Sequence, residues 1–430
     1  MSSLSSSPIP SSHTAPESGD GDSGYPEEDL RIGQNSPGYF PARLGQPLGS
    51  KNDNQRYCVS RKLGWGQFSS VWLARDRKEN RFVALKILTH ECTKALQASD
   101  TDKRSDEIAM LQKICSADRS HRGFVHTLEL YDSFTFDGPQ GNHICLVTEP
   151  LSFSLAEIRT EIGELQGDMS LTMILTKRIT KHILYALEYL HDVCGIIHGD
   201  IKHDNILCRP TDLDAVITQA LIQYPSISYT CDTRATPSIV PIISQPLPPS
   251  AELTIPTLET IFVLSDFGHS HWQKHHFQET IQPNALRAPE VILGYPWAAS
   301  ADIWNLGCLV AELLTGFWLF KYHATEGWTW EEDLLVRMTE TTGCEFDPAF
   351  LAKCQHSKKF FKEDGSFAHF TEHTEPTWSI ERLLDNFASD DCGKESFKSC
   401  AQFIRRCLRF VPEERPSARE LIEDPWLADV

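Results

Sequence analysis

The sequence predicts an α+β fold in two lobes, a small β-rich lobe and a larger lobe that is mainly helical. Residues 57–149 contain short runs rich in β-branched and aromatic residues, bounded by turn residues, with one helical stretch among them. Beyond Leu151, apolar residues recur at helical spacing over long stretches. The 430 residues suffice for two such lobes with extended tails.

Ahead of the small lobe, residues 1–28 are rich in Ser, Pro, Gly and acidic residues and poor in aliphatic ones, which predicts disorder. An extended lead-in follows, so residues 1–50 as a whole are expected to lie outside the folded domain of residues 57–430. The small lobe, residues 57–149, should be an antiparallel sheet with one helix. Strands are expected at 57–63, 70–74, 81–88, 128–134 and 144–149, and the helix at 98–114.

The large lobe is expected to span residues 151–430. Leu175, Ile179, Ile183 and Leu187 recur at helical period and indicate a long buried helix, and further helices are expected at 301–315 and 396–410. Residues 210–257, the spacer, are rich in Ser, Thr, Pro and Ile. A loop of that length is usually an insertion, so we expect a partly disordered surface segment, with a binding or targeting segment as the alternative.

Charge and cysteine usage restrict the partners. Forty Lys and Arg stand against 59 Asp and Glu, a formal net charge of −19. This argues against direct nucleic-acid or anionic-membrane binding and favours a basic protein partner, although acidity that serves only solubility fits as well. The 13 Cys show no metal-ligand spacing, and no apolar run resembles a signal peptide or membrane helix. We expect a monomer with reduced thiols, in the cytoplasm or nucleus or both.

The first chemical motif is a glycine-rich turn between two strand-like runs. It runs from Leu63 to Val71, with Gly64 and Gly66 where backbone amides can approach phosphate oxygens without a clash from Cβ. Ser69 stands where a third glycine is usual. Alone, this pattern is equally compatible with an ordinary hairpin.

The second motif is a lysine inside an apolar strand. Lys86 follows Val83, Ala84 and Leu85, and a lysine there is costly unless it is paired. Glu107, on the predicted helix, is the expected partner.

The third motif is the most specific. Residues 198–205 read HGDIKHDN and match the catalytic loop of protein kinases, HxDxKxxN. Asp200 would orient the acceptor hydroxyl and accept its proton, Lys202 would offset charge on the transferring phosphate, and Asn205 would hold a metal ion.

The fourth motif, Leu264-Ser265-Asp266-Phe267-Gly268, supplies a second metal ligand, because Asp266 would chelate Mg²⁺ between the phosphates of ATP. It precedes Ala288-Pro289-Glu290. Glu290 is expected to pair with Arg415, and Asp302 to bond the backbone of the catalytic loop. Both roles are structural.

By analogy with protein kinases, we expect a nucleotide site between the two lobes. The Glu149 carbonyl and the Leu151 amide would hold adenine, with Thr148 at the back of the pocket. The expected contacts to ATP are Leu63, Gly64, Gly66, Val71, Ala84, Lys86, Thr148, Glu149 and Leu151.

Residues 57–427 resemble the eukaryotic protein kinases. Within them the chain is most similar to the SR-protein-specific kinases, as a divergent, fungal-like member. The narrower resemblance is carried by the opening of the domain, residues 56–73, by the lead-in Pro37-Gly38-Tyr39-Phe40-Pro41, by the position of the spacer, and by His275-His276-Phe277 with Ile281-Gln282.

The resemblance implies a serine/threonine kinase that uses ATP and Mg²⁺ and acts on Arg/Ser-rich proteins such as splicing factors. It also implies an acidic docking groove in the large lobe. Glu332, Asp333 and Glu340 are the candidate groove residues, with a solvated acidic helix as the open alternative.

Two departures from the kinase pattern bear on activity. Gly199 replaces the arginine that usually binds a phosphorylated activation loop, so constitutive activity is expected. Pro283 stands where a threonine hydroxyl usually meets the catalytic Asp and Lys, which puts substrate placement in question. A pseudokinase scaffold is the alternative function, but it predicts the loss of Lys86, Asp200, Asn205 or Asp266, and all four are present. A small-molecule kinase would lack the segments around Glu290 and Asp302.

Overall fold

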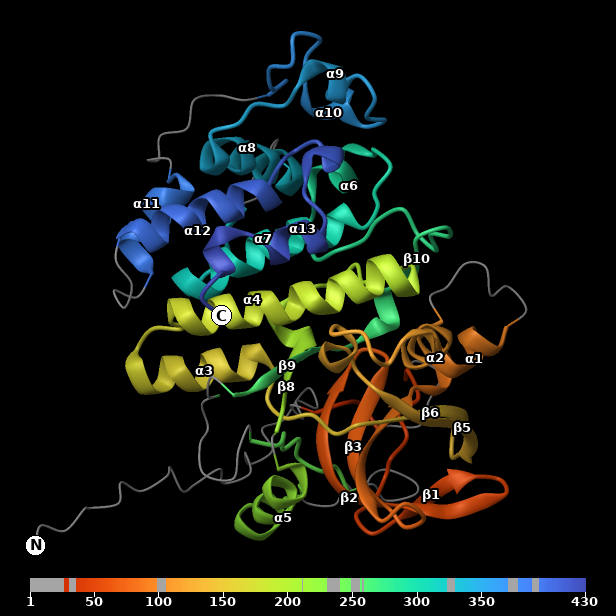
Figure 1. The fold of residues 1–430 in the computed structure, drawn as a ribbon. Coiled ribbons are helices and arrows are strands. Elements are labelled where there is room, and N and C mark those ends of the chain that lie inside the picture. The colour runs from red at the N-terminus through yellow and green to blue at the C-terminus, as the bar shows by residue number, and fades with distance from the viewer. Residues whose placement is uncertain are drawn as a thin grey trace, which may run out of the picture.

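The computed structural model describes residues 27–30, 36–98, 106–210, 212–229, 240–248, 256, 259–322, 329–369, 378–388 and 394–430. Figure 1 shows the two expected lobes, with a twisted sheet at one end of the molecule and a helical body at the other. The prediction of disorder for residues 1–26 lies outside the described residues.

The small lobe is a six-stranded sheet in the order β1-β2-β3-β4-β6-β5, with every neighbouring pair antiparallel. All five predicted strands are present, some with longer bounds, and a strand at the sheet edge was not predicted. The strands are β1 (Pro47–Ser50), β2 (Asp53–Gly66), β3 (Ser69–Asp76), β4 (Arg81–Leu88), β5 (Leu130–Gly138) and β6 (Gly141–Thr148).

The described part of residues 1–50, namely residues 27–30 and 36–50, belongs to the folded lobe, which corrects the expectation of a disordered or extended segment outside it: Glu27 and Glu28 pair with the buried Lys62. Tyr39, Phe40 and Leu48 are buried, and β1 pairs with β2. The Phe40 ring packs against Phe136 of β5 with centroids 4.9 Å apart. Single aromatic residues between glycines and prolines give no periodicity, so the sequence could not show that this segment packs on the sheet.

The predicted helix over residues 98–114 is wrong at its start. The structure has α1 (His90–Gln97) and then α2 (Glu107–Ala117), and Ala98 is extended at the end of α1. Side-chain caps set both beginnings: Thr89 accepts from the amide of Cys92 at 3.2 Å, and Asp106 accepts from the amide of Ala109 at 3.1 Å.

The large lobe is built around α4 and α7. The predicted long helix is α4 (Met173–Glu188), which continues into a π-helical turn (Tyr189–Cys194). The helix α7 (Ser300–Thr315) is buried along almost its whole length, which is why its sequence is apolar all round. The other helices are α3 (Leu155–Gln166), α6 (Pro289–Leu293), α8 (Trp330–Thr342), α9 (Pro348–Leu351), α10 (Ser357–Phe360), α11 (Ile380–Phe387), α12 (Lys394–Cys407) and α13 (Ala418–Ile422). Among the described residues, no helix is both long and apolar enough to cross a bilayer.

The described part of the spacer is packed, which corrects the expectation of a surface loop. The spacer leaves β8 (Ile206–Arg209), forms α5 (Leu213–Gln223) beside the small-lobe sheet and returns to β9 (Ile261–Leu264) (Figure 1). Ile217 and Leu247 are fully buried against Leu73 of β3. Arg61 of β2 donates to the Ala220 carbonyl at 2.9 Å. The spacer therefore ties the large lobe to the outer side of the small one.

Candidate active site

The predicted site residues meet in one cleft of about 720 Å³ between the lobes. The glycine-rich turn, β4 and the end of β6 contribute the expected nucleotide contacts, and the catalytic loop and Asp266 contribute the rest. A Cβ added to Gly64 or Gly66 would meet no atom within 4 Å, so the chain itself leaves the space beside these glycines open. The cleft is lined by Leu63, Gly64, Gly66, Val71, Ala84, Lys86, Glu107, Thr148, Glu149, Leu151, Asp200, Lys202, Asn205 and Asp266.

Lys86 joins both lobes. Its Nζ lies 2.7 Å from Oε1 of Glu107 on α2 and 2.9 Å from Oδ1 of Asp266. Burial lowers the pKa of Lys86, but the two carboxylates more than offset this and raise it, so the amine stays charged. The Lys86 charge in turn holds the pKa of Asp266 well below its usual range. Burial raises the pKa of Glu107 against the attraction of Lys86.

The catalytic loop arranges two side chains, Lys202 and Asn205, around the carboxylate of Asp200. Lys202 Nζ lies 3.0 Å from Oδ2 of Asp200. The amide nitrogen of Asn205 donates to the same oxygen and to the Asp200 carbonyl, both at 2.8 Å. Because the Asn205 nitrogen is used in this way, its amide oxygen is the atom left for a metal ion.

Buried hydrogen bonds to Asp302 of α7 fix the backbone of the catalytic loop. Both oxygens of Asp302 on α7 accept backbone amides, from His198 and from Gly199, each at 2.8 Å. His191 Nε2 lies 2.8 Å from Asp302, which is fully buried. Glu290 and Arg415 form a bidentate pair at 2.6 and 2.7 Å. The predicted structural roles of Asp302 and Glu290 are thus confirmed.

The two unusual residues fit the local backbone. Gly199 has φ +74°, a conformation that a side chain would strain. Pro283 follows Gln282, whose side chain accepts from the Ala288 amide at 2.8 Å and donates to the Ala301 carbonyl at 2.9 Å. The segment that leads to α6 is thus anchored through Gln282, and the Lys202–Asp200 contact forms without a hydroxyl at position 283.

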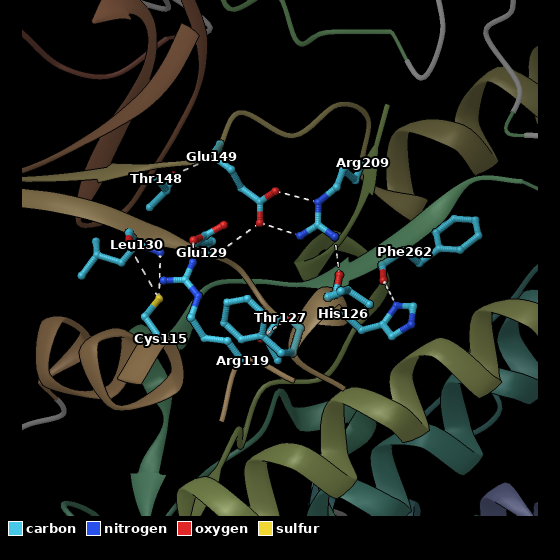
Figure 2. A network of polar contacts seen from close by, with 12 residues as sticks. Cys115, Arg119, His126, Thr127, Glu129, Leu130, Thr148, Glu149, Arg209 and Phe262 are labelled. Atoms are coloured by element: carbon cyan, nitrogen blue, oxygen red, sulfur yellow. Dashed lines mark hydrogen bonds and ion pairs between the residues drawn. The ribbon is translucent and has the colours of Figure 1, made fainter. Parts of the chain in front are cut away.

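Glu149 has a second role that the sequence did not reveal. Its carboxylate takes two bonds of 2.7 Å from Arg209 at the end of β8 and one of 3.0 Å from the amide of Glu129, as Figure 2 shows. Glu129 also pairs with Arg119, just after α2. This network connects the hinge between the lobes to the strand that follows the catalytic loop. Arg209 ends an apolar strand, but its partner is 60 residues away and no local pattern indicates it.

The proposed adenine contacts lie at the same hinge. The Thr148 hydroxyl donates to the Glu149 carbonyl at 3.1 Å (Figure 2). A carbonyl oxygen has two lone pairs, so this one can still accept from adenine. Pro246 and Leu247 of the spacer also line the cleft, a contribution that the sequence did not predict. The Phe153 amide fixes this stretch by donating to the Leu247 carbonyl at 3.0 Å.

Two of the three candidate groove acids, Glu332 and Asp333, already bond to side chains or amides of this chain. The Glu332 carboxylate accepts from the Thr329 amide at 3.1 Å and lies 2.6 Å from His369 Nδ1. Asp333 pairs with Arg337 at 2.9 Å, and both acids are buried, whereas Glu340 is half-buried. Glu332 and Asp333 are therefore neither solvated nor open for docking. Thr329 followed three residues later by Glu332 is a capping-box pattern, and this signal was in the sequence.

The residues present fit Mg²⁺. This ion is usually held by one or two carboxylates together with substrate phosphates, and Asp266 with the Asn205 oxygen supplies such a set. The described residues hold no cluster of three or more His, Cys, Asp or Glu that would bind a metal without the nucleotide.

The family model for the protein kinase domain matches residues 57–218 and 257–427, on both sides of the central spacer. The chain is 32% identical over 411 residues to "Serine/threonine-protein kinase SRPK" of Physarum polycephalum, covering 91% of this chain and 89% of the relative. The chain belongs to the SRPK family of serine/threonine protein kinases.

Two other protein kinases and one solved kinase structure are also similar to this chain. It is 29% identical over 473 residues to "Protein kinase dsk1" of Schizosaccharomyces pombe, covering 91% and 84% of the two chains. It is 26% identical to human "SRSF protein kinase 3", covering 91% and 88%. The crystal structure of a kinase domain matches the fold with a TM-score of 0.62 at 22% identity, covering 90% of this chain and 98% of that one.

Proposed function

We propose that this kinase transfers the γ-phosphate of Mg-ATP to serine in Arg/Ser-rich proteins such as splicing factors. The observation that carries the proposal is the bonded set Glu107–Lys86–Asp266, which lies in one cleft with Asp200, Lys202 and Asn205. Of the four residues whose loss would indicate a scaffold, Lys86 and Asp266 belong to this set, and Asn205 is bonded to Asp200 at 2.8 Å.

Each residue has a defined task in the transfer. Lys86 would bind the α- and β-phosphates, and Asp200 would orient the serine hydroxyl and take its proton as the hydroxyl attacks. The Nζ of Lys202 lies 3.0 Å from Asp200, and its charge would offset the negative charge on the phosphoryl group during transfer. Asp266 and Asn205 would hold Mg²⁺, which neutralises charge on the phosphate oxygens when bound.

The organisation of the loop supports activity without a phosphate switch. Gly199 offers no cation to a phosphorylated activation segment, and Asp302 holds the loop backbone directly. The Lys86–Glu107 pair is formed in the unmodified chain. We therefore expect constitutive activity.

The preference for arginine near the acceptor serine rests on charge at the mouth of the cleft. Asp204 lines the cleft close to the catalytic residues, whereas the neighbouring Glu157 is engaged in capping α3 through Ser154. The Asp204 side chain is 54% exposed, and its pKa is lowered by His203, so it stays ionised. With a net charge of −19, the protein attracts basic peptides at longer range as well. The name of the human relative, SRSF protein kinase 3, agrees with this preference.

The experiment compares kcat/KM for three peptides of equal length: an Arg-Ser repeat, a Lys-Ser repeat and a Glu-Ser repeat. We expect the order Arg-Ser, Lys-Ser, Glu-Ser, and a selective loss with the Arg-Ser repeat in Asp204→Asn. Equal rates for all three peptides would contradict the proposed substrate class, while leaving the kinase assignment intact.

A further inference from the structure

The lead-in segment makes a contact with the glycine-rich turn that neither the motifs nor the family match assigns. The Tyr39 hydroxyl donates to the Gly66 carbonyl at 2.7 Å and lies 3.1 Å from the Gln67 carbonyl. Tyr39 is only 4% exposed, and its ring meets Trp65 edge-on with centroids 6.2 Å apart. Burial, with the charges of Glu28 and Asp29, raises the pKa of Tyr39, so the hydroxyl keeps the proton that it donates.

These bonds fix the direction of two peptide groups. In a trans peptide, the C=O and the N–H of the same plane point to opposite sides. The carbonyls of Gly66 and Gln67 turn toward Tyr39, so the amides of Gln67 and Phe68 turn away from it. Gly66, Gln67 and Phe68 line the cleft, whereas Tyr39 does not.

Two backbone hydrogen bonds fix the residues just before Tyr39 against the start of α1. The His90 amide at the start of α1 donates to the Gly38 carbonyl at 2.8 Å, and the Glu91 amide donates to the Pro37 carbonyl at 3.2 Å. Gly38 has φ +77°, and a Cβ there would lie 2.8 Å from the Cβ of His90. The Thr89 amide also donates to the Phe68 carbonyl at 2.9 Å, so three successive carbonyls of the turn, at residues 66–68, are bonded either to Tyr39 or to the residue that caps α1.

We propose that Tyr39 is a positioning residue for the nucleotide phosphates, holding the glycine-rich turn so that the amides of Gln67 and Phe68 face the phosphates of ATP. Tyr39 touches no substrate and acts through the backbone of the turn. Without its hydroxyl, the two peptide planes would be free to rotate, and the turn would lose part of its preorganisation. The inference rests on the proposed nucleotide site and is independent of the protein substrate.

The test measures the dissociation constants of Mg-ADP and of adenosine, by calorimetry, for the full chain and for Tyr39→Phe. The substitution removes only the hydroxyl. One hydrogen bond of ordinary net strength corresponds to a loss of about threefold to tenfold in ADP affinity. Adenosine has no phosphate, so its affinity should stay unchanged.

Tyr57→Phe is the matched control. Tyr57 lies on β2 in the same lobe, is also buried, and donates to Oδ2 of Asp132 at 3.0 Å, but it does not line the cleft. This variant should lose a comparable hydrogen bond and bind both ligands as the unmodified chain does. Gly38→Ala would disturb the contact between the residues before Tyr39 and the start of α1, and it should reproduce the selective loss for ADP.

The outcomes separate the possibilities. An equal loss for ADP and adenosine in Tyr39→Phe would show a general structural role and overturn the inference, and so would unchanged ADP binding. If the unmodified chain phosphorylates peptides and Tyr39→Phe binds ADP normally, the inference fails while the proposed function stands. If the selective loss appears but no Arg-Ser peptide is phosphorylated, the inference holds and the substrate proposal fails.

Discussion

The pair Glu290–Arg415 allows a quantitative test of how α6 is anchored in the large lobe. Both side chains are fully buried and joined by two bonds of 2.6 and 2.7 Å. Arg415 also donates to the Arg409 carbonyl at 2.7 Å. Glu290→Gln keeps the shape of the side chain but leaves the arginine charge buried without its counter-ion. Breaking a buried pair in this way costs about 3–5 kcal/mol.

That cost is a large share of the roughly 5–15 kcal/mol that stabilises a folded domain. The assay is urea unfolding followed by tryptophan fluorescence, because the Arg415 guanidinium lies 5.0 Å from the ring centre of the buried Trp304. The matched control is Glu381→Gln. Glu381 forms a similar bidentate pair with Arg405, both bonds 2.8 Å, but the two side chains are 46% and 32% exposed. An exposed pair contributes only about 0–1 kcal/mol. Equal shifts of the urea midpoint in the two variants would refute the reasoning.

Two further predictions follow from the buried polar groups. Lys86→Met should weaken Mg-ATP binding or transfer at least tenfold, because it removes the cation that would bind the phosphates, and it should also lower the thermal midpoint, because Glu107 is left buried without its counter-charge. Peptide phosphorylation and differential scanning fluorimetry check this, and wild-type transfer would contradict the assigned role. The second prediction concerns pH: burial lowers the pKa of His126 to about 4 and of His182 to about 3, and their rings stack 4.2 Å apart. Because the unfolded chain binds these protons from about pH 6.5 downward, stability should be complete above pH 7 and fall by about 2 kcal/mol per histidine between pH 6.5 and 5. His182→Gln should flatten this fall in urea midpoints, and an unchanged slope would count against the pair.

The sequence could predict which candidate catalytic residues meet in one cleft, because phosphoryl transfer requires fixed residue types at fixed spacing. Asp200, Lys202 and Asn205 lie within six residues of one another, so their meeting is almost a local property. Lys86 and Glu107 were paired correctly because a lysine in an apolar strand needs a counter-charge, and the next helix offered one. The pairing of Glu290 with Arg415 followed from the kinase motif around Ala288-Pro289-Glu290 and not from this argument.

Features that depend on tertiary packing could not be predicted in this way. Tyr39 reaches the glycine-rich turn, and Arg209 reaches Glu149, over long separations that leave no periodic signal. The spacer looked like a loop because Pro and Ser dominate its composition, yet Ile217 and Leu247 bury it on the small lobe. For Glu332 the error was one of choice: an acid in the first turn of a helix more often caps that turn than binds a partner.

The most direct test of the central claim is transfer of labelled phosphate from Mg-ATP to an Arg-Ser repeat peptide, with Asp200→Asn as the control. Removal of the carboxylate that orients the hydroxyl and takes its proton should lower kcat by about a hundredfold or more. The variant should still bind Mg-ADP, because Lys86, Glu107 and Asp266 remain bonded to one another. Robust transfer by the unmodified chain and near-complete loss in Asp200→Asn is the predicted result. No transfer by the unmodified chain despite bound nucleotide, or full activity in the variant, would contradict the account.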